Sequence, residues 1–81
     1  MQVFNKWITI NNKALNFEFS KVVSPLGDKY FVNIFDQQFQ LSSFEVKEMK
    51  NGYWEIVLPA PQWILDIQDN IIRSIHEHIE K

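Results

Sequence analysis

Strand-length apolar segments, each ended by a turn signal, constrain the fold of this chain more than any other feature of its sequence. The turn signals are Asn11-Asn12, "SPLGD" at 24–28, "DQQ" at 36–38 and "KNG" at 50–52. Asparagine and glycine accept the backbone angles of tight turns, and proline with glycine reverses the chain. The pattern therefore predicts a four- to five-stranded antiparallel meander, with strands at about 3–10, 14–23, 29–35, 39–49 and 53–58.

One helix is predicted to follow the strands, at about residues 61–80. An apolar stripe with helical spacing runs along it, formed by Ile64, Ile67, Ile71, Ile75 and Ile79. Pro61 suits the first turn of a helix, and acidic residues lie early and basic residues late, which complements the helix dipole. The sequence thus predicts a single α+β domain over residues 1–81, with the meander packed against this C-terminal helix.

Large apolar side chains occupy both faces of the predicted strands. Tyr30, Val32 and Ile34 alternate with Phe31 and Phe35 along one strand, so the two sets point in opposite directions. One helix can cover only one face of a small sheet, and a large uncovered apolar patch usually marks an interaction site. We expect a partner or dimer face formed by Tyr30, Val32, Ile34, Phe44, Val46 and Tyr53.

The apolar alternation changes phase at Ser42-Ser43. Phe39 and Leu41 share one phase, whereas Phe44 and Val46 take the other. A β-bulge at the two serines would produce this change, since one inserted residue moves the following side chains to the opposite face. The bulge belongs either to a long, strongly twisted strand or to a bend that shapes a binding groove.

Catalytic and cofactor chemistry finds little support in the sequence. The chain has no cysteine, and its two glycines cannot build a phosphate-binding loop. His76 and His78 are two residues apart, so on a helix they diverge and cannot share one metal ion; a solvated helix end accounts for both. We expect a protein that is not an enzyme and needs no cofactor or metal.

Two functions remain for the aromatic residues, which make up 15% of the chain. Tyr53 with Lys47 and Lys50 could bind single-stranded DNA or RNA, by stacking bases and contacting phosphates. Aromatic residues are also enriched in protein interfaces, and a net charge of −2 lacks the basic excess of most nucleic-acid binders. We therefore expect a homodimer joined through its sheet that binds a protein partner, as a regulator or inhibitor. A phage accessory protein that inhibits a host factor would have these features.

The location is predicted to be cytoplasmic. The N-terminal segment lacks the uninterrupted apolar run of a signal peptide or membrane span, and no disulfide can form without cysteine. No membrane partner is expected.

The segment "DQQFQLSSFEVKEMKNGYWEIVLP", residues 36–59, resembles the central hairpin of the stage V sporulation protein G family of septation regulators. The matching positions are Asp36, Phe39, Leu41, Phe44, Val46, Asn51 and Gly52, with Pro59 displaced by one. The resemblance implies a β-meander with one C-terminal helix, a homodimer joined through its sheets, and binding to DNA or RNA. The family places a basic, glycine-containing loop with a His-Pro pair before the helix. Here "APQWILD" enters the helix directly, so no nucleic-acid-binding residue carries over.

Overall fold

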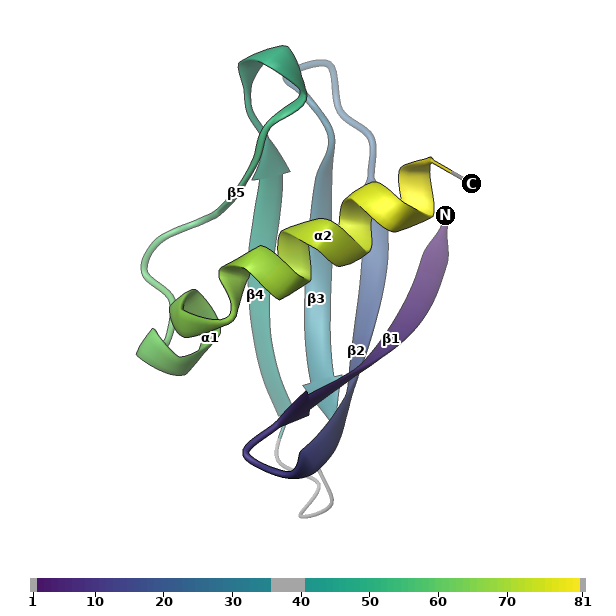
Figure 1. Cartoon of the computed structure of the whole chain (residues 1–81). Helices are drawn as coiled ribbons and strands as arrows, with labels where there is room; N and C mark the ends of the chain where they lie inside the picture. The colour runs from purple at the N-terminus through teal and green to yellow at the C-terminus, as the bar shows by residue number, and fades with distance from the viewer. Residues whose placement is uncertain (1, 36–40, 81) are drawn as a thin grey trace.

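The computed structural model describes residues 2–35 and 41–80, apart from the side chain of Leu41. Five antiparallel strands form one sheet in chain order, and the sheet curls into a half-barrel (Figure 1). The strands are β1 (Val3–Ile10), β2 (Lys13–Val22), β3 (Lys29–Phe35), β4 (Leu41–Glu48) and β5 (Trp54–Ile56). The short 3-10 turn η1 (Lys50–Gly52) joins β4 to β5. This architecture confirms the predicted α+β meander, whereas the "DQQ" turn and the strand start at Phe39 lie outside the described residues.

The asparagine turns adopt the conformations that their sequence favours. Asn11 and Asn12 have φ angles of 50° and 64° and close a two-residue hairpin between Ile10 and Lys13. Asn51 and Gly52 also have positive φ angles, 69° and 78°, in the turn before β5. These residues fix where β1, β2, β4 and β5 begin or end.

The pairing of β3 with β4 continues without interruption past the two serines. Ile34 faces Ser42, Asn33 faces Ser43 and Val32 faces Phe44, with no additional residue on either strand. The predicted β-bulge is therefore wrong. No phase shift is needed, because the backbone register that pairs Phe44 with Val32 continues to Leu41 and Phe35, and odd- and even-numbered positions of a strand belong to opposite faces.

The C-terminal segment forms two helices where the sequence predicts one. They are α1 (Gln62–Asp66) and α2 (Gln68–Ile79), which meet at Ile67 with φ −110° and ψ 16°. The Ile67 N–H donates to the Ile64 carbonyl at 3.1 Å, a tighter turn than that of an α-helix. No glycine or proline marks this break, so its position was not visible in the sequence.

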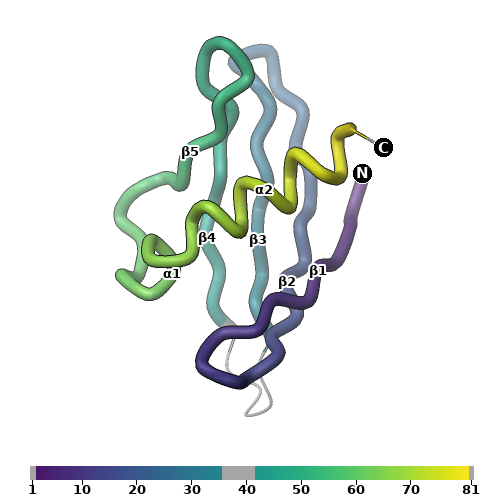
Figure 2. Tube along the Cα trace, in the orientation of Figure 1, coloured from purple at the N-terminus to yellow at the C-terminus, as the bar shows by residue number. Residues whose placement is uncertain are grey.

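Helix α2 crosses the sheet diagonally and lies over one face of it (Figures 1 and 2). Its Ile71 and Ile75, together with Ile64 of α1, are buried in the same cluster as side chains from all five strands. The sheet contributes Ile8, Phe17, Phe19, Tyr30, Val32, Ile34, Phe44, Val46, Trp54 and Ile56. Because the sheet curls around the helix, one helix covers far more apolar surface than it would on a flat sheet.

The C-terminal end of α2 packs against β1 and β2 through stacked aromatic rings. The ring of Phe4 lies between those of Phe19 and His78, at centroid distances of 4.5 and 3.9 Å. The sequence indicated that His78 belongs to a solvated helix end, whereas its side chain is only partly exposed. Its imidazole packs on the first strand and brings the two ends of the described chain close together (Figure 1).

Candidate interaction surfaces

The residues predicted to form the partner face lie, with one exception, beneath the helix. Tyr30, Val32, Ile34, Phe44 and Val46 are all buried, with exposed fractions of 7% or less. The prediction that they remain uncovered is wrong, because their cross-strand partners place them on the same face as the core phenylalanines. Phe17 faces Ile34 and Phe19 faces Val32.

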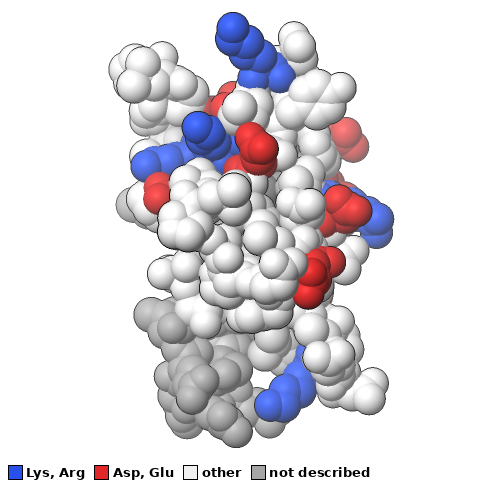
Figure 3. Space-filling model, turned by 90° about the vertical axis from the view of Figure 1, so that its left-hand side faces the viewer, with Lys and Arg blue, Asp and Glu red and all other residues white. Residues whose placement is uncertain are grey.

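Tyr53, Lys47 and Lys50 are exposed, and all three lie at the hairpin between β4 and β5. Lys47 pairs across the sheet with Lys29 on one side and Glu55 on the other. Lys29 itself contacts Glu45 at 2.9 Å. On the side of the molecule nearest β5, Figure 3 likewise shows basic and acidic side chains close to one another. The hairpin thus brings the three predicted nucleic-acid residues together in a surrounding of mixed charge.

The face of the sheet away from α2, called here the open face, is mixed in character. Among the described side chains, those on this face come from alternate positions of the strands: Val3, Asn5, Trp7, Thr9, Ala14, Asn16, Glu18, Ser20, Val22, Lys29, Phe31, Asn33, Phe35, Ser43, Glu45, Lys47 and Glu55. Three aromatic residues on it are exposed: Trp7 by 66%, Phe35 by 46% and Phe31 by 42%. Sequence reasoning placed Phe31 and Phe35 opposite Tyr30 but did not select them as the face left uncovered.

Polar contacts separate the aromatic residues of the open face. Asn5 donates a hydrogen bond to Asn16 at 3.1 Å, and Asn33 donates one to Glu18 at 3.5 Å. The ammonium of Lys29 lies 4.8 Å from the centre of the Phe31 ring. The open face is therefore not the continuous apolar patch that the sequence suggested, and apolar burial alone does not account for an association through it.

Strand β1 forms an edge of the sheet, and its outer backbone groups are unpaired within the described chain. The Lys21 N–H donates to the Gln2 carbonyl at 2.9 Å, so even-numbered residues of β1 bond to β2. Val3, Asn5, Trp7 and Thr9 then direct their N–H and C=O groups away from β2. No backbone hydrogen bond within the described residues uses these groups. The predicted meander already placed its first strand at an edge, but which residues direct their backbone groups outward was decided by the register of β1 with β2.

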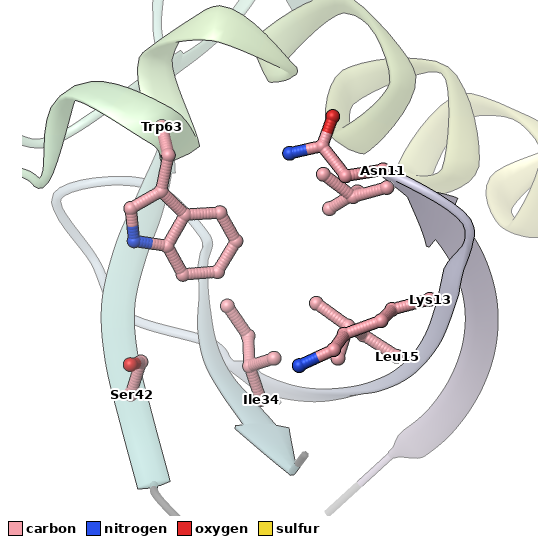
Figure 4. A pocket seen from close by; sticks show the side chains of 7 residues that line it. Asn11, Lys13, Leu15, Ile34, Ser42 and Trp63 are labelled. Atoms are coloured by element: carbon pink, nitrogen blue, oxygen red, sulfur yellow. The ribbon is translucent and has the colours of Figure 1, made fainter. Parts of the chain in front are cut away.

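A cavity of ≈ 410 Å³ lies between the β1–β2 turn, β3, β4 and α1 (Figure 4). Its lining is Ile10, Asn11, Lys13, Leu15, Ile34, Ser42 and Trp63. Trp63 is 37% exposed and borders this cavity. No pattern in the sequence indicated this cavity, because its described lining comes from four separate segments of the chain.

Tyr30 places a hydroxyl group in the core without a hydrogen-bond partner in the described residues. The residue is 1% exposed. Burial, and secondarily the negative charge of Asp28, raise the pKa of this hydroxyl above its ordinary value of 10.0. A buried polar group without a hydrogen-bond partner lowers the free energy of unfolding, so this hydroxyl destabilises the folded state.

Replacing Tyr30 by Phe is therefore expected to raise the free energy of unfolding by about 1–3 kcal/mol. The gain should grow above pH 10, because the unfolded wild-type chain then loses the tyrosine proton while the folded chain retains it. Urea denaturation of both proteins between pH 7 and pH 11 measures the effect. A less stable phenylalanine variant at pH 7 would show that the hydroxyl has a partner, such as a buried water.

Two negative findings apply to residues 2–35 and 41–80. They contain no cluster of three or more histidine, cysteine or acidic side chains able to hold a metal ion. Within the same ranges, no helix has the length and apolar character needed to cross a membrane.

The candidate sites formed by the described residues are thus an unpaired strand edge, a mixed open face and the cavity beside Trp63. Comparison of the sequence and structure with protein-family models, curated proteins and solved structures finds no significant match.

Proposed function

We propose that this protein is a small interaction module that forms a homodimer through the edge of strand β1 and binds a protein partner as a regulator or inhibitor. The observation that supports this most is the row of outward N–H and C=O groups at Val3, Asn5, Trp7 and Thr9. Such an edge is a template for pairing with another strand.

Strand β1 is the better of the two sheet edges for this purpose. It extends over 8 residues, whereas β5 at the other edge has 3. Natural proteins protect edges with proline, bulges or charges. Strand β1 has no proline and pairs with β2 without a bulge, and its one charged residue is Lys6. These features leave it open to another strand.

The edge is complementary to a second copy of itself in an antiparallel arrangement. If Val3 faces Thr9 of the partner subunit and Asn5 faces Trp7 of the partner subunit, every outward backbone group of β1 acquires a partner. Lys6 then lies opposite the partner subunit's Lys6. Each lysine contacts Glu77 of its own helix at 3.1 Å, which offsets the repulsion between the two ammonium groups.

The joined sheets would present two copies of the open face to a protein partner. Trp7 lies next to the dimer edge, and Phe31 and Phe35 lie further into the sheet. Exposed aromatic rings set among polar side chains are typical of protein interfaces. By contrast, no specific observation favours single-stranded nucleic acid, since Lys29 is paired with Glu45 and Lys47 neighbours Glu55.

The dimer is tested by removing one outward N–H group. Asn5→Pro deletes the N–H that points away from β2 and leaves the bonds between β1 and β2 in place. Asn5→Ala is the matched control, because it loses the side-chain bond to Asn16 and keeps the N–H. By light scattering at micromolar concentration, wild type and Asn5→Ala are expected to be dimers, and Asn5→Pro a monomer of 9.7 kDa.

Cross-linking gives a second test that does not depend on how well the proline variant folds. The chain has no cysteine, so Lys6→Cys introduces a single thiol at the proposed twofold axis. Facing residues in such a pair have Cα atoms about 4.5 Å apart, within the range of a disulfide. Lys6→Cys should form a covalent dimer on mild oxidation, and the exposed control Lys47→Cys should not. A monomeric wild type, or equal cross-linking of both variants, would contradict the β1 interface.

The nucleic-acid alternative predicts a different result. Binding of a mixed single-stranded oligonucleotide would weaken steeply with salt and be abolished by changing Lys47 and Lys50 together to Glu. Dimerisation through backbone pairing should survive high salt. Oligonucleotide binding that is tighter than micromolar near physiological salt would favour the alternative.

A further inference from the structure

The cavity bordered by Trp63 combines aliphatic and aromatic surface with the polar side chains of Asn11, Lys13 and Ser42. Ile10, Leu15 and Ile34 supply aliphatic surface from three strands, and α1 supplies the indole ring. Figure 4 shows Trp63 on one side of the cavity and Ile34 at its base. Its volume of ≈ 410 Å³ lies within the range of about 300–1,000 Å³ that small-molecule sites occupy.

Two polar side chains, those of Asn11 and Lys13, lie across the cavity from the indole, and Ser42 lies on the same side as Trp63 (Figure 4). The side chains of Asn11 and Lys13 point into it from the β1–β2 turn, as Figure 4 shows. Among the described residues that line the cavity, Lys13 is the one that is charged, and it takes no part in the ion pairs formed within the described chain. The positive φ angles of Asn11 and Asn12 define the tight turn from which the Asn11 and Lys13 side chains extend.

We propose that this cavity binds a small aromatic carboxylate. The flat ring would pack between the indole of Trp63 and the side chains of Ile34 and Leu15. The carboxylate would pair with the Lys13 ammonium and accept a hydrogen bond from the Asn11 amide, and hydrogen bonds between charged groups are the stronger kind. A neutral ligand of the same shape would lack the ion pair with Lys13, so we expect the charged ligand to bind more tightly.

The test uses 2-naphthoate and its neutral analogue 2-naphthamide, with isothermal calorimetry for affinity and NMR shifts for position. Naphthoate should bind saturably, shift the Trp63 indole and Ile34 methyl signals, and bind at least about tenfold more tightly than the amide. Lys13→Gln should remove that difference while leaving amide binding unchanged. The exposed control Lys47→Gln should have no effect.

Three results would overturn the proposal. They are the absence of naphthoate binding at millimolar concentration, equal affinity for the acid and the amide, and unchanged naphthoate binding by Lys13→Gln. A further variant, Trp63→Leu, should weaken both ligands, because it removes the ring that the aromatic body contacts. Circular dichroism of each variant checks that the fold is retained, and none of these positions belongs to the buried face of α2 or to the outward edge of β1.

Discussion

Replacing Val32 by Asp is expected to unfold this domain, whereas the same change at its neighbour Phe31 should leave the fold intact. Val32 is fully buried at the centre of the sheet, between Phe19 and Phe44 on the adjacent strands. A carboxylate there would have no partner, which costs about 3–5 kcal/mol. Phe31 lies on the open face and is 42% exposed, so an aspartate at that position remains in water.

Circular dichroism and urea denaturation of the two variants measure this difference. The two residues are adjacent in the chain, so strand propensity and local sequence are closely matched. A domain of this size has little stability to lose. A folded Val32→Asp protein, or an unfolded Phe31→Asp protein, would show that α2 covers the opposite face of the sheet.

The second large effect is expected at the centre of α2, where Ile71→Ala should lower the free energy of unfolding by about 2–5 kcal/mol. Ile71 is fully buried against the sheet, and truncation leaves a cavity that the neighbouring side chains fill only in part. The matched control is Ile79→Ala on the same helix. Ile79 is 47% exposed, and its truncation should change stability by no more than about 0.5 kcal/mol.

Thermal and urea unfolding of the three proteins provide the comparison. If Ile71→Ala lost less than one kilocalorie per mole, the isoleucine stripe would not be the main contact between helix and sheet. Equal losses at Ile71 and Ile79 would mean that burial against the sheet does not decide the effect, because alanine has the higher helix propensity and the substitution cannot lower stability through propensity.

Local rules were sufficient to predict the order and type of the elements. Asn11-Asn12 and Asn51-Gly52 require turns because few other residues accept their positive φ angles. Ile71 and Ile75 lie one helical turn apart, so their spacing alone identified the buried stripe of α2. These features depend on residues close together in the chain, and the structure confirms each of them.

The pairing between strands was decided only by the tertiary structure. Alternation showed that Val32 and Phe31 point in opposite directions, but it could not say which of them shares a face with Phe17 and Phe19. That depends on the register of β2 with β3, and a shift by one residue would exchange the two faces. The sequence analysis assigned Tyr30 and Val32 to the partner face because this register could not be predicted.

The curl of the sheet was also beyond the sequence. A flat sheet would leave apolar residues such as Phe44 and Val46 beyond the reach of one helix, whereas the half-barrel buries both. The cavity beside Trp63 forms because segments distant in the chain pack together. The outer edge of β1 is unpaired because no other described strand packs beside it. The sequence by itself determined the elements and their apolar stripes. Long-range packing, which joins residues distant in the chain, determined which surfaces are left for binding.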